Sequence, residues 1–229
     1  MNNLCIIPAR GGSKRIPRKN IKHFSGKPII AYSIEAALLS GLFDEVMVST
    51  DDLEIKQIAE DYGANVPFLR SETTSNDFAT TFEVLEEVWG SYQKSGKTFD
   101  NMCCIYPCAP FVTGEILKEG YDVLLDNLFD SVIPVVAYSF PIQRAFKAED
   151  KKISFVHPEF ALTRSQDLEK RYHDAGQFYW SRVAALLTTK SLVNNKTGYI
   201  ELSDLQVQDI DNETDWKLAE LKYQLLKNK

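Results

Sequence analysis

Short apolar runs that alternate with helical patterns constrain the fold of this chain more than any other feature. Residues 4–7 and 46–48 are apolar throughout, which is typical of strands buried on both faces of a sheet. Apolar residues then recur at helical spacing over 30–38 and 55–62, and a glycine follows each stretch. This alternation predicts an α/β fold with a doubly wound, mostly parallel sheet and helices on both faces.

The alternation extends along most of the chain. Asp51 or Asp52 can cap the helix after the second strand, and Thr80 with Glu83 has the spacing of a capping box before another helix. The 229 residues suffice for one α/β domain with a full core, so 1–229 is expected to be a single domain. The other expected elements are strands at 102–106, 132–137 and 177–180 and helices at 117–128 and 216–226.

Residues 140–175 interrupt this pattern. The stretch is polar, with adjacent lysines at 151 and 152 and a charged run at 167–171, and its apolar pieces are short. We expect it to leave the sheet as a small excursion. Two interpretations remain open, namely a hairpin that contacts another subunit and a solvated surface loop.

Composition excludes several classes of protein. The formal net charge of −6 at pH 7 argues against general nucleic-acid binding. No apolar run approaches the roughly 20 residues needed to cross a bilayer, and the N-terminus lacks the features of a signal peptide. None of the four cysteines is part of a C-x-x-C pair, so reduced, buried thiols are expected rather than a zinc site. We therefore expect a cytoplasmic protein without membrane or nucleic-acid partners.

A basic segment is unusual on this acidic chain. Seven Lys or Arg residues lie between Arg10 and Lys27, and the first acidic residue is Glu35. The segment follows the first strand directly, so it leaves the carboxyl edge of the sheet, where open α/β folds bind ligands. Such a cluster predicts a local anion site.

Glycines and cations in this segment are arranged as in a phosphate-binding turn. Gly11 and Gly12 can take positive φ and let the backbone approach an anion closely. Arg10, Lys14 and Lys19 can add charge-assisted hydrogen bonds to a polyphosphate. The segment matches neither G-x-x-x-x-G-K-[ST] nor G-x-G-x-x-G. A solvated basic loop would explain the charges, but not their position after a buried strand with paired glycines.

Asp209 and Asp211 form a second candidate site. In an extended segment, residues two apart point to the same side, so both carboxylates can share one cation. Mg²⁺ takes oxygen ligands and keeps several waters, so two carboxylates and phosphate oxygens suffice. The alternative is that Asp211 or Asn212 caps the last helix.

Taken in order, these motifs resemble the acylneuraminate cytidylyltransferases, or CMP-sialic acid synthetases. The opening strand and loop, Ile7 to Asn20, are similar to that family's Ile-Pro-Ala-Arg-x-Gly-Ser-Lys motif with Lys-Asn shortly after. The resemblance covers nearly the whole chain. Four further segments are similar to the family in the same order: Val48-Ser49-Thr50-Asp51, Arg70-Ser71-Glu72, Tyr106-Pro107 with Pro110, and Asp209-Ile210-Asp211.

The resemblance implies a Rossmann-like nucleotide-diphospho-sugar transferase fold and one reaction. CMP would pass from CTP to the anomeric hydroxyl of a nonulosonic acid, an acidic nine-carbon sugar, giving a CMP-sugar and pyrophosphate with Mg²⁺ as cofactor. The implied catalytic residues are Lys19, Asp209 and Asp211, and the two aspartates would bind the metal. The nucleotide would contact Arg10, Gly11, Gly12, Ser13, Lys14, Lys19 and Asn20, with Arg70, Ala79 and Thr81 around the cytosine, and the sugar would contact Tyr106, Arg164, Gln177 and Tyr179.

Two departures from the family bear on the sugar. Residues 106–110 read Tyr-Pro-Cys-Ala-Pro where sialic acid enzymes usually have Gln-Pro-Thr-Ser-Pro, and 174–180 lack their Asn-Gly segment. With residues 171–177, these differences look most like the pseudaminic acid branch, which implies flagellin or other bacterial surface glycosylation and a homodimer through 140–175. Legionaminic or N-acetylneuraminic acid as acceptor and a non-catalytic nucleotide-binding module are the alternatives. A glycosyltransferase is disfavoured because the Asp pair lies near the C-terminus.

Overall fold

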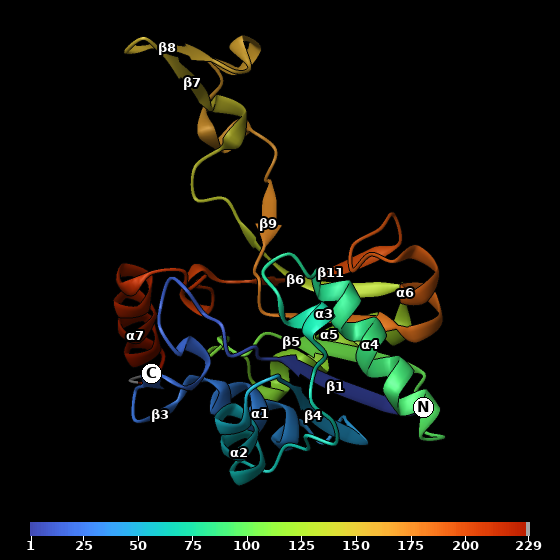
Figure 1. Cartoon of the computed structure of the whole chain (residues 1–229). Coiled ribbons are helices and arrows are strands. Elements are labelled where there is room, and N and C mark those ends of the chain that lie inside the picture. The colour runs from blue at the N-terminus through green and yellow to red at the C-terminus, as the bar shows by residue number, and fades with distance from the viewer. Residues whose placement is uncertain (228–229) are drawn as a thin grey trace.

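The chain folds around one seven-stranded sheet (Figure 1), seen in a computed structural model that describes residues 1–227. Six strands lie in the order β11-β6-β10-β5-β1-β4, and β9 pairs with the carboxyl end of β6. β1 is parallel to β4 and β5, and β6 is parallel to β11, so the predicted α/β fold with a mostly parallel sheet is confirmed. The strands are β1 (Asn3–Pro8), β4 (Glu45–Ser49), β5 (Asn101–Ile105), β6 (Ser131–Ala137), β9 (Tyr172–Asp174), β10 (Phe178–Arg182) and β11 (Thr197–Leu202).

Helices cover both faces of the sheet. α1, α2 and α5 pack on the face that carries Cys5 and Val48, whereas α4 and α6 pack on the face that carries Ile6 and Met47. Neighbouring residues of one strand thus belong to different cores, as the pleat of a strand requires. None of the helices in residues 1–227 combines the length and apolar character needed to cross a membrane. The helices are α1 (Ile29–Ser40), α2 (Leu53–Asp61), α3 (Glu72–Ser75), α4 (Thr81–Lys94), α5 (Gly114–Asp126), α6 (Val183–Thr189) and α7 (Glu213–Lys227).

A third apolar cluster joins the C-terminal helix to the basic segment. Trp216 of α7 packs with Ile16 and Phe24 from that segment and with Ile210. The Phe24 and Trp216 rings meet edge to face, with centroids 5.7 Å apart. Two short strands, β2 (His23–Phe24) and β3 (Lys27–Pro28), turn the segment back toward α1. This cluster places two regions that are distant in the sequence side by side.

The helix caps agree with the sequence. Asp52, rather than Asp51, caps α2, and its carboxylate accepts hydrogen bonds at 3.0 Å from the backbone N–H groups of Glu54 and the residue after it. Thr80 and Glu83 form the predicted capping box at the start of α4. Asp52 thereby holds the turn between β4 and α2 in a defined shape at the carboxyl edge of the sheet.

β10 differs from the prediction in its direction. It is antiparallel to both β5 and β6, although the doubly wound pattern was expected to resume there. β6 ends at the carboxyl edge, and the chain returns as β9, which is antiparallel to β6. Between β6 and β10 the chain makes short helical turns instead of a crossover α-helix, so β10 starts at the carboxyl edge and runs the opposite way. α6 and β11 were not predicted.

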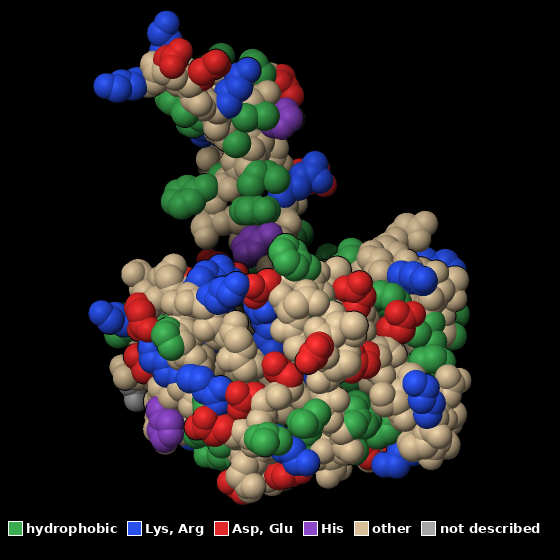
Figure 2. Space-filling model, in the orientation of Figure 1, with side chains coloured by type: hydrophobic (Ala, Val, Ile, Leu, Met, Phe, Trp, Pro, Cys, Tyr) green, Lys and Arg blue, Asp and Glu red, His purple; other side chains and the backbone are tan. Residues whose placement is uncertain are grey.

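Residues 138–171 project from the body as an arm (Figure 1). At its tip β7 (Phe146–Glu149) and β8 (Lys152–Phe155) form an antiparallel hairpin. Apolar side chains on the arm are exposed, most of all Leu162 at 99% and Phe140 at 85%. Figure 2 shows such hydrophobic side chains gathered along the arm. The arm therefore presents an uncovered apolar surface.

Candidate functional site

A cavity of about 410 Å³, the main cavity, opens at the carboxyl edge of the sheet, beyond the ends of β1 and β5. The loops after both strands, the turn before β10 and the segment before α7 form its wall. Figure 2 shows Lys and Arg side chains gathered on the side of the body where α7 and the basic segment lie. From the basic segment the cavity is lined by Arg10, Ser13, Lys14, Arg15, Lys19 and Asn20.

The cations of the basic segment have protein partners around this cavity. Arg10 Nη1 lies 2.5 Å from Asp77 Oδ1, and Lys14 pairs with the other oxygen of the same carboxylate. Lys19 Nζ donates a hydrogen bond to the backbone carbonyl oxygen of Ile210 at 2.7 Å. Lys19 therefore ties the basic segment directly to the segment that precedes α7.

Asp209 and Asp211 lie in the segment before α7, which contacts the basic segment. Ile210 between them is 2% exposed, whereas Asp209 is exposed and Asp211 is half-buried. This alternation places both carboxylates on the outer side of the segment. Asp209 lines the main cavity, and Asp211 Oδ2 pairs with Arg15 Nη1 at 2.6 Å. The structure thus brings Asp209 and the basic segment together at one cavity, whereas Asp211 is not among the lining residues and is joined to the cavity through its ion pair with Arg15.

Asn212, rather than Asp211, caps α7. Asn212 Oδ1 accepts hydrogen bonds from the backbone N–H groups of Thr214 at 2.8 Å and Asp215 at 3.1 Å. Asp215 Oδ2 accepts in return from the backbone N–H of Asp211 at 2.9 Å. Capping therefore leaves the Asp211 carboxylate available for other partners.

The donor set at the aspartate pair suits a hard cation. Both groups are carboxylates, and Mg²⁺ is commonly held by one or two carboxylates with waters and phosphate oxygens. Asp209 faces the cavity, and Asp211 contacts one exposed guanidinium. In residues 1–227, the aspartate pair included, no group of three or more His, Cys, Asp or Glu side chains is placed to share a metal ion. The protein therefore offers two carboxylates at most, and their chemistry fits an ion that takes its remaining ligands from water and phosphate.

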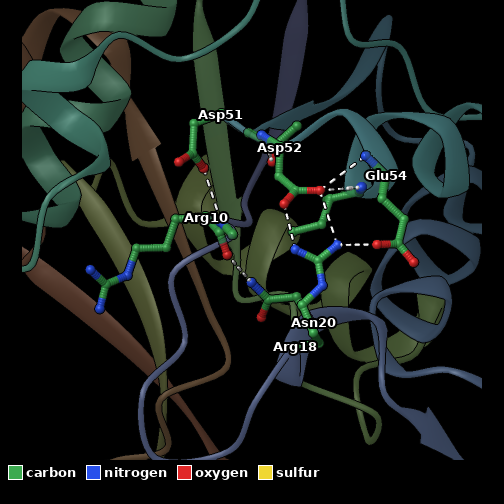
Figure 3. Close-up of polar contacts among 9 residues, drawn as sticks. Arg10, Arg18, Asn20, Asp51, Asp52 and Glu54 are labelled. Carbon is green, nitrogen blue, oxygen red and sulfur yellow. Dashed lines mark hydrogen bonds and ion pairs between the residues drawn. The ribbon is translucent and has the colours of Figure 1, made fainter.

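Arg18 faces away from the main cavity and, with Asp52 and Glu54, forms the clasp (Figure 3). Its guanidinium donates to both Asp52 oxygens, one at 3.1 Å, and to Glu54. The Arg18 hydrogen bonds, with those from the α2 cap, lower the pKa of Asp52 to about 2. Arg18 has a left-handed backbone, with φ 53° and ψ 31°, which is uncommon for a residue other than glycine. The clasp fixes the turn after which Lys19 enters the cavity.

Gly11 is held against the same turn. Its backbone N–H donates to Asp51 Oδ1 at 2.9 Å. A Cβ at this position would lie 2.8 Å from Asp52 Oδ2, so the close approach requires glycine. The close backbone approach that glycine allows is thus observed at Gly11, but neither Gly11 nor Gly12 has positive φ, and in this loop positive φ occurs at Arg18. Both glycines were predicted to contact the nucleotide, but neither is among the lining residues of the main cavity.

Asn20 is fixed at both ends of its amide. Its Nδ2 donates to the carbonyl oxygen of Arg10 at 2.9 Å, and the Cys108 thiol donates to its Oδ1 at 3.3 Å. Burial raises the pKa of the Cys108 thiol to about 12, so the thiol keeps its proton at neutral pH. Cys108 belongs to the 106–110 segment that departs from sialic acid enzymes. That departure therefore lies in the wall of the main cavity.

A second cavity of about 200 Å³ adjoins the first. Arg70, Ala79 and Thr81, the residues predicted to surround the cytosine, line it together. Arg70 is 8% exposed, and its Nη2 donates to the Ser49 carbonyl oxygen at 2.6 Å. Burial lowers the pKa of Arg70. The residues that line both cavities are Pro8, Arg10, Asp77 and Tyr106.

The residues predicted to bind the sugar are not all at the surface of the cavity. Tyr106 lines it, but Gln177 and Tyr179 are 2% and 5% exposed and lie behind the wall. Tyr179 donates through its hydroxyl to Asp174 Oδ2 at 2.6 Å, and burial raises its pKa. Gly176 reaches the cavity beside Gln177. β10 and the residue before it thus support this wall from behind.

Arg164 lies apart from the other predicted residues. It precedes a short helical turn, Ser165–Asp167, on the arm and lines neither cavity. The arm extends away from the body (Figure 1). Within one chain, the structure does not bring Arg164 to the predicted sugar site.

Two further residues line the main cavity that no motif had indicated, namely Asp77 and Gln208, and Arg15 lines it from within the opening motif although no role had been predicted for it. Arg15 contributes to the predicted basic charge, but the charge pattern does not say which cations face the cavity. Asp77 meets Arg10 only because the 76–80 loop folds over the basic segment, and a contact of that kind has no local signature.

Comparison with known proteins shows which family the chain resembles. A family profile described as Cytidylyltransferase matches residues 4–220. A pseudaminic acid cytidylyltransferase of Campylobacter jejuni is 42% identical over 226 residues, which cover 98% of this chain and 97% of the relative. A CMP-N,N'-diacetyllegionaminic acid synthase of Legionella pneumophila is 32% identical over 227 residues, which cover 96% and 95% of the two chains.

The fold has a counterpart among solved structures. A CMP:2-keto-3-deoxy-manno-octonic acid synthetase complexed with CTP aligns with a TM-score of 0.71 at 18% identity, over 100% of both chains. At this identity the likeness concerns the fold alone. The profile and the relatives, by contrast, match nearly the whole sequence. The chain belongs to the cytidylyltransferase family.

Proposed function

We propose that this protein transfers CMP from CTP to the anomeric hydroxyl of pseudaminic acid, giving CMP-pseudaminic acid and pyrophosphate. The observation that carries the proposal is the hydrogen bond from Lys19 to Ile210, because it joins the basic segment to the segment that carries Asp209 and Asp211, and Asp209 lines the same cavity. The 42% identical Campylobacter jejuni relative is named for pseudaminic acid, which supports the choice of sugar.

Two adjoining cavities suit the two halves of a nucleotide. In the main cavity Arg10, Lys14 and Lys19 offer charge-assisted hydrogen bonds to a triphosphate. In the second cavity the Thr81 hydroxyl and the buried Arg70 offer polar groups to a base. Arg10 lines both cavities, so phosphates close to the nucleoside would lie beside it.

The reaction displaces pyrophosphate at the α-phosphorus. The anomeric oxygen of the sugar forms a bond to this phosphorus, the bond to the oxygen that bridges to the β-phosphate breaks, and the hydroxyl proton is released. Negative charge grows on the leaving pyrophosphate, and Lys14 and Lys19 stabilise it. Tyr106 and Asn20 line the same wall and hold the reactants in position.

Asp209 and Asp211 are the residues that we propose to hold Mg²⁺. When bound, the ion would polarise the α-phosphate and offset its negative charge. For Asp211 to act as a ligand, its ion pair with Arg15 must open. Arg15 is exposed, so this rearrangement costs little.

We also propose a homodimer that forms through the arm. Large exposed apolar patches on a protein surface mark contact sites. A second copy that packs on the arm would cover this surface. The exposed apolar residues of the arm are Tyr138, Phe140, Ile142, Phe146, Ile153, Val156 and Leu162.

The proposed product fits a role in glycosylation of a bacterial surface. A Campylobacter coli relative, 30% identical over 219 residues, is named post-translational flagellin modification protein B. In this proposal the enzyme works in the cytoplasm and supplies the activated sugar for flagellin.

Mass spectrometry of the products tests the proposal. The purified protein is incubated with Mg²⁺ and pseudaminic acid and with CTP, UTP, ATP or GTP in turn, and the best nucleotide is then offered with legionaminic and N-acetylneuraminic acid. We expect CMP-pseudaminic acid from CTP as the dominant product. A larger yield with another sugar would favour that acceptor, and nucleotide binding without any product would favour a non-catalytic module.

A further inference from the structure

Asp77 is an acidic residue inside a cationic site. It lines both the main and the second cavity, and its two carboxylate oxygens are bound by Arg10, at 2.5 Å, and by Lys14. These are two of the cations that the proposed function assigns to the triphosphate. A protein carboxylate therefore already occupies the donors that a phosphate would use.

The contacts of Asp77 differ from those of a residue that holds its own loop together. Asn76, its neighbour, shapes that loop by accepting hydrogen bonds from the backbone N–H groups of Phe78 at 2.8 Å and Ala79 at 3.0 Å. The side-chain hydrogen bonds of Asp77 go instead to the basic segment. The loop can keep its shape when the Asp77 carboxylate loses its partners.

The two ion pairs are also easy to exchange. The Asp77 side chain is 36% exposed, Arg10 is 34% exposed and Lys14 is 78% exposed. Ion pairs at this exposure contribute little net stability, because water and salt screen them. A triphosphate carries several negative charges and can bind the same cations more strongly, but it repels a carboxylate left beside it.

We propose that Asp77 sets the affinity of the site for phosphates by exchanging with them at Arg10 and Lys14. In the empty cavity the ion pairs with Asp77 hold the Arg10 and Lys14 side chains at the cavity. Both ion pairs break when the triphosphate binds, and both form again when pyrophosphate leaves. The inference rests on the proposed function, since it assumes that Arg10 and Lys14 bind the phosphates. Its consequence is that Asp77 weakens the binding of both CTP and pyrophosphate and assists product release.

Replacement of Asp77 tests the sign of this effect. Titration calorimetry measures the binding of CTP and of inorganic pyrophosphate to the wild type and to the Asp77→Asn variant, and steady-state kinetics gives KM for CTP and product inhibition by pyrophosphate. We expect Asp77→Asn to bind both anions about tenfold more tightly, because removing a like charge beside a bound anion has an effect of this order. A residue that merely supports the fold would change affinity in the opposite direction.

Two controls isolate the mechanism. Asp122→Asn also removes one carboxylate and one exposed ion pair, that with Lys118 at 2.6 Å, but it lies on α5 outside both cavities, so it should leave the affinities unchanged. In a Lys14→Ala background, Asp77→Asn should gain clearly less affinity than it does in the wild type, because one of its two partners is already missing. Asp77→Ser serves as a second variant, and thermal melting verifies that each variant folds.

The outcomes are distinguishable. If the wild type binds CTP and pyrophosphate but Asp77→Asn and Asp77→Ser bind them equally or more weakly, the exchange is refuted and the proposed function stands. If both variants bind more tightly but the gain is the same in the Lys14→Ala background, the exchange at Lys14 is refuted. If the wild type binds neither anion, the proposed function fails and this inference fails with it.

Discussion

Two carboxylates bind cations of the same basic segment, but their surroundings differ. Asp52, in the clasp, is 21% exposed and also accepts two backbone hydrogen bonds from the start of α2. Asp77, in the main cavity, is 36% exposed, and both of its side-chain hydrogen bonds go to Arg10 and Lys14. The clasp is therefore fixed by the fold, whereas the pairing in the cavity can exchange.

This difference shows how one short segment can combine a rigid attachment to the fold with cations that are able to exchange partners. Arg18 and Lys19 are neighbours in the sequence, yet Arg18 binds the scaffold and Lys19 faces the cavity. The left-handed backbone of Arg18 separates their directions. The charge of a Lys or Arg side chain therefore does not define its role here. What matters is whether its carboxylate partner is also held by other groups, because only a carboxylate without such contacts can be replaced by a ligand.

Lys19→Ala should have the largest effect of the variants that probe this comparison. We expect turnover to fall about 100-fold or more, roughly 2.7 kcal/mol of transition-state stabilisation, because the departing pyrophosphate loses a cation. The melting temperature should fall slightly, because the hydrogen bond from Lys19 to the carbonyl oxygen of Ile210 is lost while the clasp stays intact. Steady-state kinetics and thermal melting give both quantities, with Lys118→Ala as the matched control. Wild-type turnover from Lys19→Ala would remove this residue from the mechanism.

Asp211→Asn should have the next largest effect. It leaves the cap of α7 intact, because Asn212 provides that cap, but it removes one of the two proposed metal ligands. We expect the Mg²⁺ concentration for half-maximal activity to rise about tenfold, in line with the loss of one carboxylate from a weak site. A magnesium titration of activity measures this, and Asp204→Asn is the control. An unchanged titration would contradict the metal site.

Asp52→Asn should have a smaller and different effect. The asparagine oxygen can still cap α2, but the charged partner of Arg18 is lost. We expect the melting temperature to fall by about 2–4 °C, as for a loss of about 1 kcal/mol in a chain of this size. KM for CTP should rise more than turnover falls, because the loop that positions the cations loosens. A lower melting temperature with an unchanged KM for CTP would show that the clasp does not position the cations that line the cavity.

The pH dependence of stability gives the smallest signal. The pKa of Asp52 is lowered from 3.8 to about 2, so its stabilising contribution is complete above its ordinary pKa and is lost as the pH falls through about 2. Between pH 5 and 3 the melting temperature of the wild type should therefore fall further than that of Asp52→Asn. Parallel melting curves over this range would indicate that the clasp adds no charge-dependent stability.

Local patterns in the sequence predicted most of the sheet but not every direction in it. The apolar runs at 4–7 and 46–48 became parallel strands because each is followed by a crossover helix. β10 carries an equally apolar run, yet it is antiparallel, since the arm returns the chain at the carboxyl edge. Strand direction depends on the path between strands, and the polar composition of 140–175 gave no information about that path.

Local sequence patterns likewise predicted the candidate site in outline but not in detail. The position of the basic segment after β1 and the spacing of Asp209 and Asp211 indicated which regions would meet. Asp209 lines the main cavity with the basic segment, and Asp211 contacts that segment at Arg15. The direction of Arg18 and the place of Asp77 were not predictable, because both depend on tertiary contacts with loops 50–54 and 76–80. Side-chain direction within a charged segment therefore has to be taken from the structure.

A crystal structure of the protein with CTP and Mg²⁺ tests the central claim most directly. We expect the triphosphate in the main cavity, with Lys19 bound to its oxygens, Asp77 released from Arg10 and Lys14, and the ion held by Asp209 and Asp211. A triphosphate bound elsewhere, or an ion that contacts neither aspartate, would contradict the claim that one cavity binds the nucleotide and its metal together.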